Sequence, residues 1–346
     1  MELMIFDHDR KLAGIVESFS FLRWSRRYSR CGSFELKAIA SPENVALLQI
    51  GNYLWKSDDG EAGIIENLTM SQTDKEMITV SGRFATSILA RRIMWGTVTL
   101  NHDLNVVIQF LINNSIMAPA TEVRRIDYIT YAGVTTGHIV KAQISYRNIL
   151  DCATQLCEAA DVGLKTMFNT STGIFTVTLY KGTTSQAVFS REYENITEQV
   201  FTKNISDYAN TALIGGAGEG VDRLFMSITD GVGEDRREVF VDARDMQQVT
   251  YGTNYNASLL FRGQTKLSEL AVVQSFDATV SSHGNLLYKQ DFDLGQVVQV
   301  ISKRWGVALT TRITEIEETY DETGLSLNVV FGRGLLTLAQ KLKGSA

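Results

Sequence analysis

The segment SFELKA, residues 33–38, constrains the fold more than any other part of the chain, because polar and apolar side chains alternate along it. A period of two residues is typical of a β-strand with one face on a core and the other in solvent. Similar patterns recur up to Ser87, and Asp58-Asp59-Gly60 is a turn signal between two of them. We therefore predict that residues 1–87 form an all-β domain, wound as a barrel.

Strands dominate the expected structure of this first domain. The predicted strands are Leu3–Phe6, Ile15–Phe19, Phe34–Ala40, Tyr53–Ser57, Ile64–Gln72 and Met77–Gly82. The whole chain has 2 prolines and 27 glycines. Because proline removes a donor from a β-ladder while glycine permits bulges and turns, this composition suits many paired strands. We find no proline-rich or serine-rich linker in the sequence and expect closely packed domains.

Arginines and aromatic residues are interleaved just before the first segment, in FSFLRWSRRYSR at residues 19–30. One interpretation is a solvated edge strand whose charges prevent aggregation. The other is a subunit interface, where arginine and large aromatic side chains are enriched and arginine pairs with carboxylates. The interface hypothesis assigns these contact residues: Arg23, Trp24, Arg26, Arg27, Tyr28 and Arg30.

The hydrophobic periodicity becomes helical after Phe84. The predicted elements are helices at residues 84–94, 104–115 and 146–162 and strands at residues 163–169 and 173–182. Asn101 and Asp103 are candidate caps for the second helix, Ser145 is one for the third, and Gly163 can end the third. Residues 88–198 are therefore predicted to form an α+β domain.

Strand patterning returns near Val200 and, after a helical segment, continues to Gly332. The clearest hairpin joins residues 313–319 to residues 325–331, and we expect the second strand to turn Leu325, Leu327, Val329 and Phe331 to an inner face. The predicted division of this half is a second barrel from residues 199–240 and 286–335, a small insert at residues 241–285 with a helix at 263–276, and a C-terminal tail at 336–346.

Several segments together resemble a known family. The run SFLRWSRRYSRCGSFEL at residues 20–36 is followed by GNYLW and DDGEAGIIENL, and residues 146–168 and 285–332 continue the pattern. These segments resemble the tail-hub proteins of long-tailed bacteriophages, which also occur in prophages and in phage-tail-like bacteriocins. The resemblance spans nearly the whole chain, and its motifs are strand patterns rather than catalytic signatures.

The resemblance implies a mixed β and α+β fold, with two tail-tube-like β-barrels, an α+β domain between them and a small helical insert in the second barrel. It implies a homotrimer that closes the distal end of a tail tube, joins it to the baseplate or tail tip and lines the DNA passage. Three chains with two barrels each would match a sixfold tube. The implied partners are a distal tail or tail-tube protein, a tape-measure protein and a separate receptor-binding or spike protein, in a virion assembled in the bacterial cytoplasm.

Composition excludes several classes of protein. A net charge of −6 and a pI near 5.4 argue against a protein whose main task is to grip nucleic acid, which needs a basic footprint. No apolar run approaches the roughly 20 residues of a membrane span, and MELMIFDHDRK lacks the pattern of a signal peptide. Cys31, Cys152 and Cys157 are odd in number and widely placed, which indicates reduced thiols rather than a disulfide framework.

Catalytic patterns are weak. The spacing of the four histidines does not match a metal-binding motif. They are His8, His102, His138 and His283. The glycine-rich residues 215–220 lack the ending of a phosphate-binding loop and are read as a hairpin loop. Asp291 and Asp293, two apart on an expected strand, are a candidate pair for a glycosidase or a calcium site, or else a turn or an intersubunit ion pair.

We therefore predict a structural protein, not an enzyme, with no cofactor and no metal. Chain residues after Gly332 are too few for a wall-degrading or receptor-binding domain, and we expect a separate polypeptide to supply such an activity. Two alternatives stay open. One is a tail-associated hydrolase of peptidoglycan or polysaccharide, and the other is a module that binds the host surface.

Overall fold

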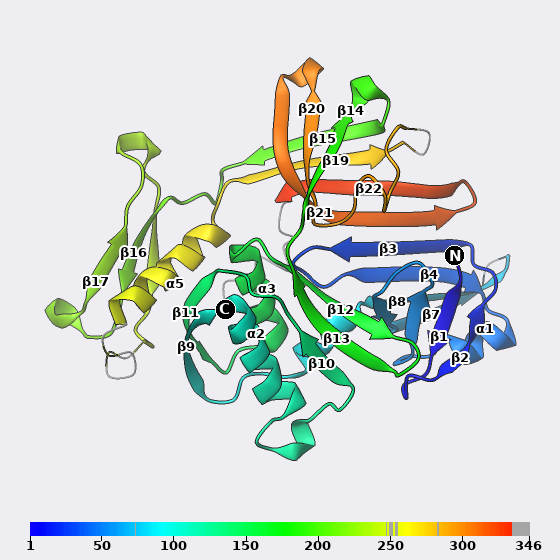
Figure 1. Ribbon diagram of the computed structural model, residues 1–346, viewed down its shortest axis with the longest axis horizontal. Coiled ribbons are helices and arrows are strands. Elements are labelled where there is room, and N and C mark those ends of the chain that lie inside the picture. Colours follow the sequence, from blue (N-terminus) through cyan, green and yellow to red (C-terminus); the bar gives the residue numbers. More distant parts are fainter. Residues whose placement is uncertain (73, 247, 249–251, 253–254, 282–283, 334–346) are drawn as a thin grey trace.

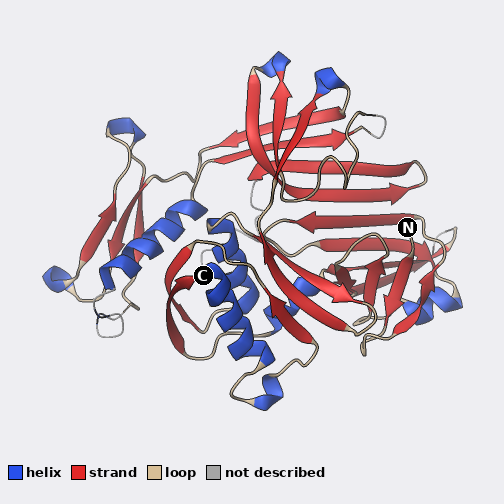
Figure 2. Cartoon of the chain, viewed as in Figure 1, coloured by secondary structure: helices blue, strands red, loops and turns tan. Residues whose placement is uncertain are grey.

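The computed structural model describes residues 1–72, 74–246, 248, 252, 255–281 and 284–333. Its strands form two β lobes that meet along one continuous sheet, with an α+β domain beside them and a smaller insert that projects to one side (Figures 1 and 2). The predicted tail at 336–346 lies outside the described residues. The fold is therefore mostly β-sheet with some helices, distributed over several sheets.

The first lobe packs two sheets around one core. One sheet has the order β2-β1-β5-β6, and the other contains β3-β4-β8-β7. Their bounds are β1 (Leu3–Phe6), β2 (Leu12–Val16), β3 (Phe21–Arg27), β4 (Ser33–Ile39), β5 (Tyr53–Lys56), β6 (Ala62–Ile64), β7 (Asn67–Gln72) and β8 (Glu76–Arg83), with helix α1 (Pro42–Leu47) after β4. The alternation that predicted β4 is confirmed, since Phe34, Leu36 and Ala38 are buried. The predicted strand at 64–72 is two strands, β6 and β7.

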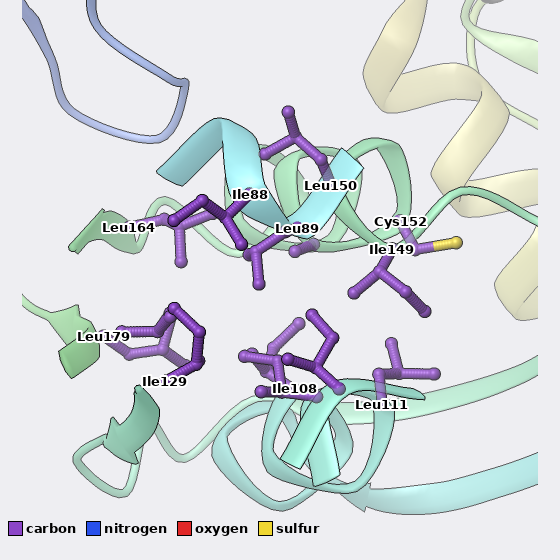
Figure 3. Close-up of a cluster of buried hydrophobic side chains, with 14 of the residues drawn as sticks. Ile88, Leu89, Ile108, Leu111, Ile129, Ile149, Leu150, Cys152, Leu164 and Leu179 are labelled. Carbon is purple, nitrogen blue, oxygen red and sulfur yellow. The ribbon is translucent and has the colours of Figure 1, made fainter. Parts of the chain in front are cut away.

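The α+β domain has its own apolar core, part of which is shown in Figure 3. Its elements are the 3-10 helix η1 (Ala85–Arg91), β9 (Thr97–Asp103), α2 (Leu104–Ile112), the π-helical turn η2 (Asn113–Met117), the 3-10 turn η3 (Glu122–Arg124), β10 (Ile129–Ala132), β11 (Ile139–Ser145), α3 (Ile149–Ala159), β12 (Gly163–Asn169) and β13 (Ile174–Tyr180). Ile108 and Leu111 of α2 face Ile149 of α3 across this core (Figure 3). This domain combines helices and strands, whereas β14 (Thr184–Ser190), within the predicted range 88–198, pairs with a strand of the second lobe.

Helix α3 starts later than predicted. Asn148, not Ser145, caps it, because the Asn148 side chain accepts hydrogen bonds from the backbone of Leu150 and Asp151. Tyr146 has a left-handed φ of 50° and cannot belong to the helix. Asp103 caps α2, as predicted, by accepting from the backbone of the residue two positions on.

The second lobe contains six strands around a second core. They are β14 (Thr184–Ser190), β15 (Ile196–Asn204), β19 (Val273–Val280), β20 (Val297–Ser302), β21 (Val307–Asp321) and β22 (Gly324–Arg333), with the 3-10 turns η4 (Arg191–Tyr193) and η8 (Lys303–Trp305). The predicted hairpin is confirmed as β21 and β22. Val329 and Phe331 lie in the core as expected, but Leu325, at the turn, is exposed.

A single sheet runs through both lobes. Its order is β15-β19-β22-β21-β3-β4-β8-β7, and β20 with β14 branches from β21. The strand β21 makes this possible because its first half pairs with β20 and its second half pairs with β22 on one side and β3 on the other. The strand order is open at both ends among the described residues, so neither lobe is the closed barrel that the sequence predicted.

The insert is a three-stranded sheet covered on one face by a helix. Its elements are β16 (Thr211–Gly215), β17 (Phe225–Ile228), β18 (Glu238–Asp242), α5 (Tyr255–Glu269) and the 3-10 turns η5 (Gly220–Asp222) and η6 (Gly233–Asp235). This grouping differs from the prediction that residues 199–240 belong to the second barrel. The predicted helix at 263–276 is also shifted, since α5 ends at Glu269 and Val273 already begins β19.

Candidate functional site

The arginine-rich ribbon of β3 lies inside the chain, at the junction of the two lobes. Strand β3 pairs with β4 on one side and with β21 of the second lobe on the other. Trp24 sits directly opposite Glu318 in this pairing, and Arg27 opposite Glu315. The segment that the sequence assigned to a subunit interface is thus the strand that joins the lobes of one chain (Figure 1).

The six predicted interface residues differ in exposure. Trp24 and Tyr28 are buried in the single chain and present no surface to a neighbour. The four arginines keep between 12% and 44% of their side chains exposed. All four also pair with carboxylates of the same chain: Arg23 with Glu35, Arg26 with Asp59 and Asp293, Arg27 with Glu315, and Arg30 with Glu158. Their contact with a second subunit stays a prediction.

A lysine and a glutamate are completely buried at this junction. Lys56 on β5 and Glu318 on β21 each have 0% of their side chains exposed, and Lys56 Nζ lies 2.7 Å from Glu318 Oε2. Lys56 Nζ also donates to Asp58 Oδ1 at 2.8 Å. The hydroxyls of Tyr288 and Tyr320 donate to the two carboxylate oxygens of Glu318, at 2.8 and 2.7 Å. The buried carboxylate is therefore both paired and hydrogen-bonded, as a buried charge requires.

The charges around Lys56 hold one another in place. Burial lowers the pKa of Lys56, but Glu318 and Asp58 outweigh burial and keep that pKa above its ordinary value. Burial raises the pKa of Asp58, yet hydrogen bonds from Lys56 and Lys289 bring it down to about 2. Lys289 Nζ donates to Asp58 Oδ2 at 3.0 Å. Lys56 and Asp58 are therefore both charged at neutral pH.

Arg26 links this network to two more carboxylates, those of Asp59 and Asp293. Its Nη1 donates to Asp293 Oδ1 at 2.7 Å and to the Tyr288 hydroxyl at 3.0 Å. Its Nε, buried and without a hydrogen bond, lies 3.4 Å from Asp59 Oδ2, which accepts from Trp24 Nε1 at 2.8 Å. Burial lowers the pKa of Arg26, but Asp59 and its neighbours raise it well above its ordinary value. We call the charged residues of this network the junction cluster: Arg26, Lys56, Asp58, Asp59, Lys289, Asp293 and Glu318.

Glu61 is a buried carboxyl at the edge of the junction cluster. Burial, and next the charge of Asp59, raises the pKa of Glu61 to about 8. Arg26 and Lys165 act in the opposite direction and do not compensate. Glu61 is therefore protonated at neutral pH, and adds no further negative charge to the cluster.

Tyr28 marks the point where the lobes meet the α+β domain. Its hydroxyl donates to the carbonyl of Asp161 at 3.2 Å and accepts from the backbone N–H of Gly182 at 3.0 Å. Its ring packs edge-on against Tyr180 at 5.2 Å. Gly295 fits against the Tyr28 ring because it has no side chain: a Cβ there would lie 2.6 Å from the ring, and its φ is 84°.

The residues proposed for catalysis have structural partners. Asp291 and Asp293 lie in a turn, not on the strand that the sequence predicted. Asp291 Oδ2 accepts from the backbone N–H of Leu287 at 2.7 Å, and Asp293 pairs with Arg26. No group of three or more potential metal ligands occurs among the described residues. These contacts fit the interpretation of Asp291 and Asp293 as turn and ion-pair residues. The ion pair between Asp293 and Arg26 lies within one chain, not between subunits.

The remaining candidate motifs also have structural roles. Gly215 ends β16, and residues 216–220 begin the loop between β16 and β17, as the prediction of a hairpin loop expects. Burial raises the pKa of Cys31 to about 12 and that of Cys152 to about 11, so these thiols are poor nucleophiles at neutral pH. Cys31, Cys152 and Cys157 are all free. Across the described residues, we find no helix that is both long enough and apolar enough to cross a membrane.

Sequence reasoning missed Lys56 and Glu318, although a signal exists. In β21, Ile316, Glu318 and Tyr320 fall on one face by the two-residue period, so Glu318 stands where an apolar residue is expected. A charged residue in phase with a buried face predicts a buried partner of opposite charge. The sequence does not say which lysine or arginine that partner is.

Solved structures of low sequence identity share this fold. The 43 kDa tail protein of prophage MuSo2 from Shewanella oneidensis is 15% identical with a TM-score of 0.64, and the match covers 96% of this chain and 98% of that one. A tail protein from Neisseria meningitidis is 12% identical with a TM-score of 0.63, covering 96% of both chains. Prophage tail protein gp18 from Listeria monocytogenes is 13% identical with a TM-score of 0.62, covering 99% of both.

A family model matches the sequence itself. No curated protein matches the chain. The model described as Siphovirus ReqiPepy6 Gp37-like protein matches residues 2–333, which is nearly the whole chain. The family resemblance inferred from the strand motifs agrees with this match and with the tail-protein folds above. The chain therefore belongs to the Siphovirus ReqiPepy6 Gp37-like family.

Proposed function

We propose that this protein is a tail hub: three copies form a ring that closes the distal end of the tail tube and surrounds the DNA passage. Membership in this Siphovirus family, together with a fold shared with prophage tail proteins, supports a structural role in the virion tail. The observation that carries the finer proposal is the sheet that crosses both lobes. Each chain supplies two β lobes in one sheet, so three chains would supply six lobes to match a sixfold tube.

The two ends of this sheet give the ring a way to close. Strands β7 and β15 are the ends of its main strand order, from which β20 and β14 branch, and each pairs with a single neighbour among the described strands. Met70 on β7 is 52% exposed and Val200 on β15 is 56% exposed. An exposed edge with apolar side chains is a template for another strand. Pairing β15 of one copy with β7 of the next is a head-to-tail contact, which generates a ring if the rotation closes.

The partners implied by this role are those that meet a tail tube at its end. We expect a distal tail or tail-tube protein on one side of the ring, a tape-measure protein in contact with its passage and a receptor-binding or spike protein beyond it, at the tail tip or baseplate. The acidic net charge suits a passage that does not hold DNA. The proteins of similar fold are described as tail proteins, and their descriptions lend no support to a cell-wall hydrolase.

Molar mass in solution tests the ring. Light scattering over a concentration series, followed by negative-stain imaging, should give three times the chain mass of 38.5 kDa and particles with a central hole. The double variant Met70→Asp/Val200→Asp places like charges across the proposed contact and should give monomers. The control Val123→Asp changes an equally apolar, exposed residue of η3 and should leave the trimer intact.

Two results would contradict the proposal. One is a wild-type chain that stays monomeric at every concentration and also in the presence of the tail-tube protein. The other is a trimer that the edge variant does not weaken, since that trimer would use another surface.

A further inference from the structure

The insert presents a sheet face on which Arg223 lies across Gly215 and against two exposed aromatic rings, and no helix of the described chain packs on it. Helix α5 packs on the opposite face, against Ala212 and Ile214 of β16. On the free face, Leu213, Phe225 and Phe240 are 44%, 48% and 51% exposed. Figure 1 shows the insert at one side of the molecule, with α5 between its sheet and the α+β domain. The free face therefore points away from the body of the chain.

Strand register gathers these side chains into one patch. Phe240 on β18 lies beside Leu213 on the central strand β16, and Phe225 on β17 lies beside Gly215 on the other side. Since residues two apart on a strand share a face, Leu213 and Gly215 belong to the same surface as both rings. We call Leu213, Phe225 and Phe240 the insert face.

Arg223 contacts both aromatic rings of the insert face and holds them in position. The Arg223 guanidinium lies 5.5 Å from the Phe225 ring centre and 5.4 Å from the Phe240 ring centre. It crosses Gly215, where a Cβ would lie 2.5 Å from Nη2, and donates to the Gly215 carbonyl at 2.8 Å. Asp242 pairs with it at 2.8 Å. The two rings are therefore held in place by a cation whose own charge is compensated, and a prearranged surface loses little entropy on binding.

The borders of the insert face are acidic. Residues 205–246 contain nine carboxylates and four arginines, a net charge of −5 in a chain whose total is −6. The loop at one end of the sheet carries Glu219 and Asp222. The loop at the other end carries three acids, Asp230, Glu234 and Asp235, and two arginines, of which Arg236 pairs with Glu238 of β18. An apolar centre with carboxylates at both ends is complementary to a surface of apolar and positively charged side chains.

Each of the two loops at the ends of the insert sheet also exposes a valine. Val221 of η5 is 100% exposed and Val232 of η6 is 86% exposed. Each lies next to a glycine with a left-handed φ, Gly220 at 55° and Gly233 at 59°. Clusters of exposed apolar side chains on one element mark interaction sites more often than they occur by chance.

We propose that the insert face binds a positively charged, extended segment of a different protein. Charge excludes the other candidates: a second copy would bring the same five excess negative charges, and anionic phospholipid and nucleic acid would be repelled. The occupant is thus a lysine- or arginine-rich strand whose apolar side chains pack on Phe225 and Phe240. This binding does not depend on ring formation, because the insert face involves neither β7 nor β15.

Fluorescence anisotropy with the full-length protein tests this proposal. The probe is a short labelled peptide of alternating lysine and valine, and its counterpart replaces each lysine by glutamate. We expect the lysine peptide to bind and the glutamate peptide not to bind. The double variant Phe225→Ser/Phe240→Ser should weaken binding by at least about tenfold, equivalent to about 1.4 kcal/mol. The variant Glu219→Gln/Asp222→Asn/Glu234→Gln should weaken binding and flatten its dependence on salt.

Matched controls separate specific docking from attraction to an acidic protein. Ile50→Ser/Val123→Ser removes two exposed apolar side chains outside the insert and should leave the affinity unchanged. Circular dichroism of each variant checks that the insert still folds. The proposal is overturned if the lysine peptide does not bind at low salt, or if the Phe225→Ser/Phe240→Ser variant binds it as tightly as the wild type.

Discussion

The junction of the two lobes and the insert face both depart from the usual placement of side chains, in which charged groups are exposed and aromatic rings are buried. At the junction, Lys56 and Glu318 are fully buried and hydrogen-bonded. On the insert, Phe225 and Phe240 are about half exposed. Buried charges need partners already in place within the chain, whereas exposed rings stabilise little until something covers them. We therefore read the junction as a finished internal contact and the insert face as a contact that still lacks its partner.

Removing the buried lysine should produce the largest change. Lys56→Met removes the nearer cation of the buried Glu318 and leaves Lys289, 3.9 Å away, and we expect a loss of about 3 kcal/mol in the free energy of unfolding. The double variant Lys56→Met/Glu318→Gln removes both charges, keeps an acceptor for a tyrosine hydroxyl and should recover part of that loss. Urea unfolding of both variants measures the difference. Equal stability of Lys56→Met and wild type would show that the buried pair does not hold the lobes together.

Glu61 should make the junction sensitive to pH. Below about pH 4.5, its ordinary pKa, the carboxyl is protonated in both the folded and the unfolded chain. As the pH rises to about 8, the unfolded chain releases this proton and the folded chain keeps it. This group therefore lowers stability by up to about 1.4 kcal/mol per pH unit in that range.

The variant Glu61→Gln cannot ionise, so its stability relative to wild type should rise between pH 5 and about pH 8 and then level off. Thermal unfolding of both proteins across this range provides the test. A difference that does not change with pH would place the carboxyl in contact with water.

A substitution of Gly295, beside Tyr28, should test how closely the two lobes and the α+β domain pack against one another. Gly295→Ala puts a non-glycine residue in a left-handed conformation and adds a Cβ 2.6 Å from the Tyr28 ring. We expect a loss of about 1–3 kcal/mol in the free energy of unfolding. Gly306→Ala is the matched control because Gly306 has a φ of 64° but open space around it. Calorimetry of both variants separates steric from conformational cost. Equal losses would mean that Tyr28 moves freely aside.

Changes on the insert face should have the smallest effect on stability. Because its rings are about half exposed, Phe225→Ser/Phe240→Ser should alter the free energy of unfolding by no more than about 0.5 kcal/mol per site. The same urea experiment used for Lys56→Met makes the comparison direct. A large loss would show that these rings belong to the core of the insert.

The sequence predicts structure well where the signal is local. The alternation around Phe34 and the hairpin of β21 and β22 both follow from a two-residue period and a turn. It fails where distant segments meet: Lys56 and Glu318 are 262 residues apart in the chain. No local pattern shows that β16 belongs to a separate small sheet that packs on α5, rather than to the large sheet. The sequence predicts the arginine ribbon to be a subunit interface or a solvated edge strand, whereas its observed partners lie in the same chain and its contact with a second subunit stays a prediction.

The most direct test of the hub proposal is a cysteine cross-link between the two free edges of the sheet. The variant Met70→Cys/Val200→Cys places one thiol on β7 and one on β15, and both native positions are exposed. Under mild oxidation, we predict a non-reducing gel with a covalent ladder that ends at three chains, and neither single variant should go beyond two. Failure of the double variant to cross-link in preparations that light scattering shows to be trimeric would contradict the account. A ladder that continues beyond three chains would contradict the closed ring.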